Sequence, residues 1–98
     1  MKFGLRYCNT DKYATDTALA VELVQAGEEA GFESAWTVEH TVIPSGYESV
    51  YPYSESGKIA GGAEDLILPD PLIWMAHMAG VTNTIKFGTA ILILPQHS

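Results

Sequence analysis

The sequence predicts an α/β fold in which parallel strands alternate with helices. Three observations predict it: a period-two apolar pattern near the N-terminus, two segments with apolar residues at helical spacing, and two later apolar, β-branched runs. They follow one another in the order β-α-β-α-β. Helical crossovers in this order join adjacent parallel strands by right-handed connections. No internal repeat or second domain is visible, so we treat residues 1–98 as part of one domain.

The first strand and helix are predicted within residues 2–31. Lys2 to Cys8 alternates apolar with polar residues, as a strand does. Thr15 or Asp16 can cap the helix that follows, and Gly31 can end it in the left-handed conformation. Its apolar face is expected to consist of Leu19, Leu23, Ala26 and Ala30.

The second strand is expected at Ser34 to His40, because this short, mostly uncharged run is typical of a parallel strand buried on both faces. A connection of residues 41–69 follows, which is far longer than the usual 2 to 6 residues. Connections of that length are usually functional, so we interpret residues 41–69 as an active-site loop.

A second helix and a third strand complete the pattern. Asp70 as N-cap and Pro71 at the first helical position start the helix, which is expected to end near Thr82 to Asn83. The third strand is expected at Ile85 to Leu94, since its last four residues are too uniformly apolar to face water, and Pro95 should end it. The core face of the helix is expected to be Leu72, Met75, Ala76 and Ala79.

Composition excludes several classes of protein. The chain has 98 residues, 47% of them apolar, and a net charge of -7 with five Lys and Arg side chains. So few cations cannot neutralise a row of phosphates, which argues against nucleic acid and anionic membranes as partners. One cysteine excludes an internal disulfide, and neither a signal peptide nor a long apolar run is present. We therefore expect a cytoplasmic protein.

Chemistry is expected at the carboxyl ends of the strands, where parallel α/β folds place their sites. Three ends converge there: residues 7–9, residues 39–40 and residues 90–95. His40 can give or take a proton near neutral pH, and Glu39 can hydrogen-bond a ligand. Because consecutive strand residues face opposite sides, both can face one site only if the strand bends. The alternative is that His40 is a buried strand histidine bonded to backbone.

The remaining reactive side chains carry weaker predictions. No metal site is expected, since His97 lies beyond Pro95 and no second ligand stands at metal spacing. Cys8 is interpreted as a small buried hydrophobe, and His77 as a partly exposed packing residue. The tyrosines of the long connection could cover an aromatic ligand or only pack the loop: Tyr47, Tyr51 and Tyr53.

Several motifs together resemble the bacterial-luciferase-like superfamily, and within it the coenzyme F420-dependent oxidoreductases. They are Lys2-Phe3-Gly4-Leu5, Ala30 to Ser34, Trp36 to His40, Pro69-Asp70-Pro71 and Gly88 to Leu92. The resemblance implies a (β/α)8 TIM barrel, of which these residues would be the N-terminal β-α-β-α-β portion. It also allows a homodimer of the full-length protein.

The same resemblance implies roles for individual residues. His40 would be the catalytic acid or base, and Glu39 would contact the deazaflavin. A bulge with a non-proline cis peptide at Ala90-Ile91 would support the ring, with Ile93 nearby as a further cofactor contact. Thr41 stands where luciferases carry a second histidine, which favours F420 over FMN.

Three functional hypotheses follow. The first is hydride transfer between F420 and a small organic substrate, and the second is an FMN-dependent luciferase-like monooxygenase. The third is that residues 1–98 alone are a non-catalytic fragment, because three parallel strands would leave sheet edges and apolar surface open.

Overall fold

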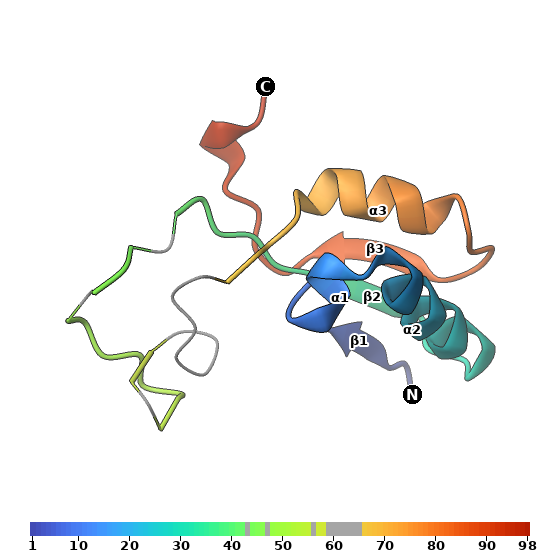
Figure 1. Cartoon of the computed structure of the whole chain (residues 1–98). Helices are drawn as coiled ribbons and strands as arrows, with labels where there is room; N and C mark the ends of the chain where they lie inside the picture. The colour runs from blue at the N-terminus through green and yellow to red at the C-terminus, as the bar shows by residue number, and fades with distance from the viewer. Residues whose placement is uncertain (43, 47, 56, 59–65) are drawn as a thin grey trace.

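The fold is a three-stranded parallel sheet with helices packed against it. The computed structural model describes residues 1–42, 44–46, 48–55, 57–58 and 66–98. In this part of the chain the strands pair in the order β1-β2-β3 and all run parallel, which confirms the predicted α/β fold. The elements, drawn in Figure 1, are β1 (Gly4–Arg6), α1 (Lys12–Thr15), α2 (Thr17–Glu29), β2 (Ser34–Thr37), α3 (Pro71–Ala79), β3 (Lys86–Thr89) and the 3-10 helix η2 (Leu94–Gln96).

The core lies between the sheet and helices α2 and α3. Leu5, Ala35 and Phe87 stand in register on the three strands, so their side chains share one face of the sheet. That face meets α2 and α3, where the Trp74 ring lies edge-on to Phe87 with centroids 6.3 Å apart. A Cβ on Gly27 would lie 2.5 Å from Leu5 Cδ1, so the glycine lets α2 approach β1 closely.

Both long helices begin where the sequence predicts. The Asp16 carboxylate accepts the Leu19 N–H at 3.0 Å and caps α2. Asp70 caps α3 in the same way, with Pro71 in the first turn. Gly31 adopts a φ of 88°, as predicted for the residue that ends a helix.

The predicted core faces of the helices are wrong by about one position. In α2 the buried residues are Ala20, Val24 and Gly27, whereas Ala26 and Ala30 are exposed and Leu19 and Leu23 are partly buried. Because α2 lies close to Leu5, the side of the helix with its smallest residues packs against the sheet. In α3, which ends at Ala79, Trp74 and Met78 are buried and Met75 is partly buried against the core, whereas Leu72, Ala76 and Ala79 are exposed. This helix is apolar nearly all round, so spacing could not show which side faces Phe87.

Each strand is shorter than predicted. Tyr7 has a φ of 58°, which turns the chain out of β1. The ladder of β2 stops at Thr37, and that of β3 stops at Thr89. The apolar run after β3 is not a buried strand, because Ile91 is 55% exposed and Leu94, in η2, is 69% exposed. The predicted cis peptide at Ala90-Ile91 is absent, as no described peptide bond is cis.

At the amino ends of the strands, the Glu28 carboxylate ties α2 to β3. It accepts the backbone N–H groups of Asn83, Thr84 and Ile85 at 2.7 to 3.2 Å. These three N–H groups hold the pKa of Glu28 below its usual value of 4.5. The carboxylate thereby fixes the chain that enters β3.

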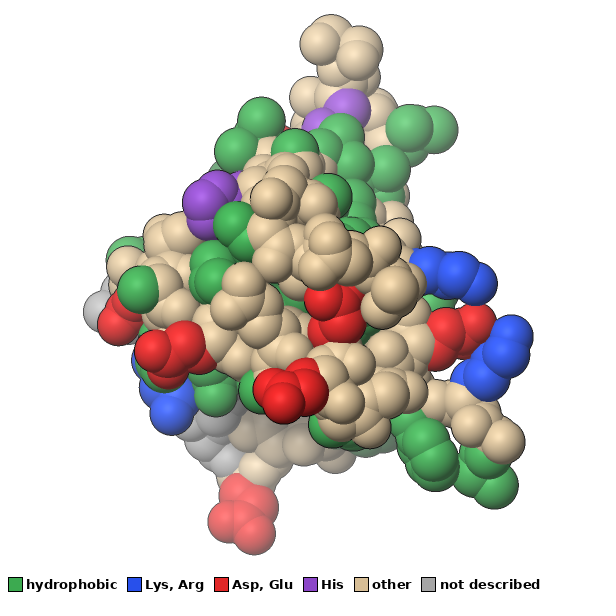
Figure 2. Space-filling model, turned by 90° about the vertical axis from the view of Figure 1, so that its right-hand side faces the viewer, with side chains coloured by type: hydrophobic (Ala, Val, Ile, Leu, Met, Phe, Trp, Pro, Cys, Tyr) green, Lys and Arg blue, Asp and Glu red, His purple; other side chains and the backbone are tan. Residues whose placement is uncertain are grey.

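Acidic residues outnumber basic ones in the chain, with 12 Asp and Glu against five Lys and Arg. Figure 2 shows Asp and Glu side chains spread over one face, with Lys and Arg at its margins. Glu33 forms ion pairs with Lys2 and Lys86 at 3.0 and 3.2 Å. No helix among the described residues is long and apolar enough to cross a membrane.

Candidate functional site

A cavity of about 600 Å³ opens at the carboxyl ends of the strands. The β2–α3 connection and the C-terminal segment leave the sheet at this same end (Figure 1). All three strand ends and the described part of the connection line the cavity. The lining includes Arg6, Tyr7, Val38, Glu39, His40, Tyr51, Tyr53, Ala90 and Ile91.

The structure brings four of the five predicted site residues to this cavity: Glu39, His40, Ala90 and Ile91. The imidazole of His40 is exposed, so the alternative of a buried strand histidine is wrong. Ile91 is more than half exposed and lines the same cavity. Ile93, the fifth, does not line the cavity, and its N–H donates to the Glu39 carboxylate.

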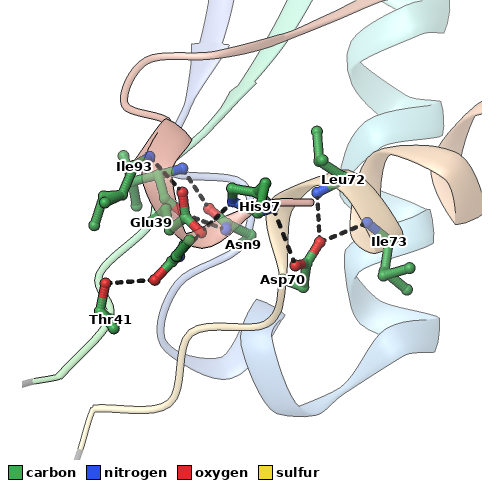
Figure 3. A network of polar contacts seen from close by, with 10 residues as sticks. Asn9, Glu39, Thr41, Asp70, Leu72, Ile73, Ile93 and His97 are labelled. Carbon is green, nitrogen blue, oxygen red and sulfur yellow. Dashed lines mark hydrogen bonds and ion pairs between the residues drawn. The ribbon is translucent and has the colours of Figure 1, made fainter.

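Glu39 is the most constrained side chain of the site, with 8% of the residue exposed. Figure 3 shows its carboxylate facing the segment after β3. Oε2 accepts the Ile93 N–H at 2.7 Å, and Oε1 lies 2.7 Å from His97 Nε2 and also accepts from Gln96 Nε2. Burial acts to raise the pKa of Glu39, but these donors outweigh it and the pKa lies below 4.5.

His97 connects this network to helix α3. Its Nδ1 lies 4.0 Å from Asp70 Oδ2, while the other Asp70 oxygen caps α3 (Figure 3). Sequence reasoning missed His97 because it lies 58 residues from Glu39 and beyond the proline expected to end the strand. Within the described residues, no group of three or more His, Cys, Asp and Glu side chains could hold a metal ion.

Asn9 is a second residue that sequence reasoning missed. It is completely buried, and its carboxamide bonds both to the N–H and to the carbonyl of Val38. The only sequence signal was its place at a strand end. Cys8 beside it is buried as predicted, and burial raises the pKa of its thiol.

Aromatic side chains and one cation complete the described walls. Tyr51 and Tyr53 pack edge-on with ring centroids 5.6 Å apart, whereas Tyr47 lies outside the described residues. Arg6 is the one Lys or Arg among the described lining residues, and its guanidinium lies 4.3 Å from the centre of the Tyr7 ring. His77, by contrast, is exposed on α3 and does not line the cavity.

Comparison with known proteins identifies the family of this chain. The sequence matches the family described as luciferase-like monooxygenase over residues 1–98. The chain belongs to the luciferase-like family. It is also similar to an uncharacterized Sinorhizobium fredii protein, y4vJ, with 34% identity over 78 residues.

The match covers very different shares of this luciferase-like chain and of y4vJ. The matched region is 80% of this chain but 16% of y4vJ. The chain therefore spans a small part of that relative's length. Activity, substrate and cofactor are accordingly matters of proposal.

Proposed function

We propose that this luciferase-like protein transfers a hydride between coenzyme F420 and a small organic substrate. The observation that carries the proposal is the cavity that His40 and Ile91 both line, at the carboxyl ends of the parallel strands. Ligands of open and closed α/β sheets bind at this end of the strands.

The residues present fit the flat ring of such a cofactor. A volume of about 600 Å³ lies within the range of ligand pockets, and Ala90 and Ile91 offer an apolar wall for a planar ring. Arg6 is a single cation, so the described walls suit the ring better than they suit an anionic tail. F420, when bound, supplies hydride chemistry, while the protein supplies orientation and electrostatics.

His40 has the position of the acid or base in this proposal. Its exposed imidazole can give a proton to a substrate heteroatom, or take one from it, near neutral pH. Glu39 stays a predicted cofactor contact. Each of its oxygens already accepts from residues 93–97, so its first effect is to hold that segment beside the cavity.

A second candidate is an FMN-dependent monooxygenase. The description of the matching family favours it, and an apolar wall suits either ring system. Thr41 in place of a second histidine after His40 favours F420.

Titration of the intact protein with F420 and with FMN, followed by quenching of cofactor fluorescence, separates the two. We expect saturable binding of F420 and weaker binding of FMN. Tight FMN binding without F420 binding would replace the first proposal by the second.

A further proposal concerns the 98 residues as an isolated polypeptide: we propose that they do not turn over F420. Several large apolar residues are exposed to solvent in this structure, including Phe3 (58% exposed) and Trp36 (41% exposed). Exposed apolar surface of this kind favours association over a stable monomer. Turnover by the isolated, monomeric polypeptide would contradict this proposal.

A further inference from the structure

We infer that Asn9 is a positioning residue for His40. Its carboxamide takes the place of a missing strand neighbour beside Val38, and so directs the chain that carries Glu39 and His40 into the cavity. The inference deepens the proposed function and rests on it for the role of His40.

The first step is the early end of β1. Arg6 is its last residue, and Tyr7 turns the chain away with a φ of 58°. The last backbone link from this segment to β2 is a long bond of 3.5 Å, from the Cys8 N–H to the Trp36 carbonyl. In a parallel ladder, the next residue of β2 to bond on this side is Val38.

Asn9 supplies both bonds that Val38 lacks. Asn9 Oδ1 accepts the Val38 N–H at 3.0 Å, and Asn9 Nδ2 donates to the Val38 carbonyl at 2.7 Å. A carboxamide carries the same donor and acceptor as a peptide group. On the other side the Thr37 carbonyl accepts the Ala90 N–H at 2.8 Å. The chain after β2 is therefore held like a central strand, although β1 has ended.

The two bonds from Asn9 affect the site because Val38 stands one residue before Glu39 and two before His40. Val38 is partly buried, and a backbone group shielded from water without a partner is costly, so loss of Asn9 would make this segment move to find one. Two non-glycine residues with positive φ, Tyr7 and Asp11, flank Asn9, and both line the cavity. Backbone strain of this kind concentrates at functional sites.

Aspartate at position 9 tests the bridge. Asn9→Asp keeps the shape but removes the donor, and its charged form turns an oxygen toward the Val38 carbonyl. Complete burial of position 9 and the facing Val38 carbonyl disfavour the charged form, so the introduced carboxylate should take up a proton in mild acid. The protonated form restores a donor, so the defect should be reversible with pH. Gln25→Glu is the matched control, because Gln25 Nε2 also donates to a backbone carbonyl, that of Val81, and Gln25 does not line the cavity.

The experiment measures amide hydrogen exchange of Val38 and the kcat of the intact protein at about pH 8 and about pH 5, each against wild type at the same pH. For Asn9→Asp we expect Val38 exchange about tenfold faster at the higher pH, with a lower kcat and little change in cofactor affinity. Both should return toward wild type at the lower pH. Gln25→Glu should match wild type throughout.

If Asn9→Asp has the same Val38 amide exchange rate and the same kcat as wild type at both pH values, the inference is wrong. If this variant does not fold, the wild-type protein decides. Val38 exchange as slow as that of Trp36 in β2 supports the bridge, and exchange as fast as that of an exposed loop contradicts it. Failure of wild type to bind either cofactor would reject the proposed function and leave the exchange test of Asn9 intact.

Discussion

Glu28 and Glu39 hold the chain at opposite ends of β3, and the two ends differ in what surrounds the carboxylate. Glu28 accepts three consecutive backbone N–H groups before the strand, and it does not line the cavity. Glu39 accepts one backbone N–H and two side-chain donors after the strand, and it lines the cavity. Both pKa values are lowered, so a shifted carboxylate alone does not mark the functional end.

The difference indicates a division between stability and chemistry along the strands. In parallel barrels the amino ends of strands serve stability, and the carboxyl ends carry sites. Removing a side chain at the Glu28 end should therefore lower the stability of the fold, whereas a substitution at the Glu39 end should lower turnover. Substitutions at the two ends of the strands test this division.

His40→Ala should give the largest loss of activity. General acid–base catalysis contributes about 10²- to 10⁴-fold, so kcat of the intact protein should fall by that order while cofactor affinity stays nearly unchanged. Because the imidazole is exposed, the melting temperature should barely move. His77→Ala is the control, since His77 is an exposed histidine on α3 outside the cavity. Wild-type turnover by His40→Ala would remove His40 from the mechanism.

Glu39→Gln should have a smaller effect on the same site. Glutamine keeps one acceptor oxygen but brings an NH₂ group against the donors from residues 93–97. We expect kcat/KM to fall about tenfold and the Ile93 amide to exchange faster. Glu33→Gln, which removes a surface carboxylate paired with Lys2 and Lys86, should leave both unchanged. An unaltered Ile93 exchange rate in Glu39→Gln would show that this carboxylate does not hold the segment.

Glu28→Gln should change stability without changing turnover. The amide can no longer accept all the N–H groups before β3, so the melting temperature should fall by a few degrees. Turnover per folded molecule, measured well below that temperature, should equal wild type. A loss of kcat as large as that of Glu39→Gln would end the distinction between the two ends.

The contribution of Glu28 should also depend on pH in a defined direction. Its folded pKa lies below the ordinary 4.5, so its stabilising effect is complete above that value and is lost as pH falls through the folded pKa. The difference in unfolding free energy between wild type and Glu28→Gln, from denaturant titrations, should be constant near neutrality and shrink in acid. A difference that grew on acidification would contradict the assignment.

The sequence predicted features that depend on local chemistry. Asp16, Asp70 and Gly31 act on the backbone within a few residues, so their roles as caps and stop could be inferred directly. The placement of His40 and Ile91 at one cavity followed from the rule that parallel strands end on the same side.

The features that sequence reasoning missed depend on contacts between distant residues. Asn9 bonds to Val38, 29 residues away, and His97 meets Glu39 at twice that separation. Neither pairing leaves a spacing pattern in the chain. The apolar run after β3 was predicted to continue the strand, and the reason for the error is related. The Ile93 N–H donates to the Glu39 side chain instead of a neighbouring strand, and β3 ends at Thr89.

A crystal structure of the intact protein with F420 bound would show whether His40 and Ile91 flank one cofactor ring. We expect the ring to lie in the cavity with one face against Ile91 and with the His40 imidazole at its edge. A ring bound elsewhere, with His40 and Ile91 both free of contact, would contradict it.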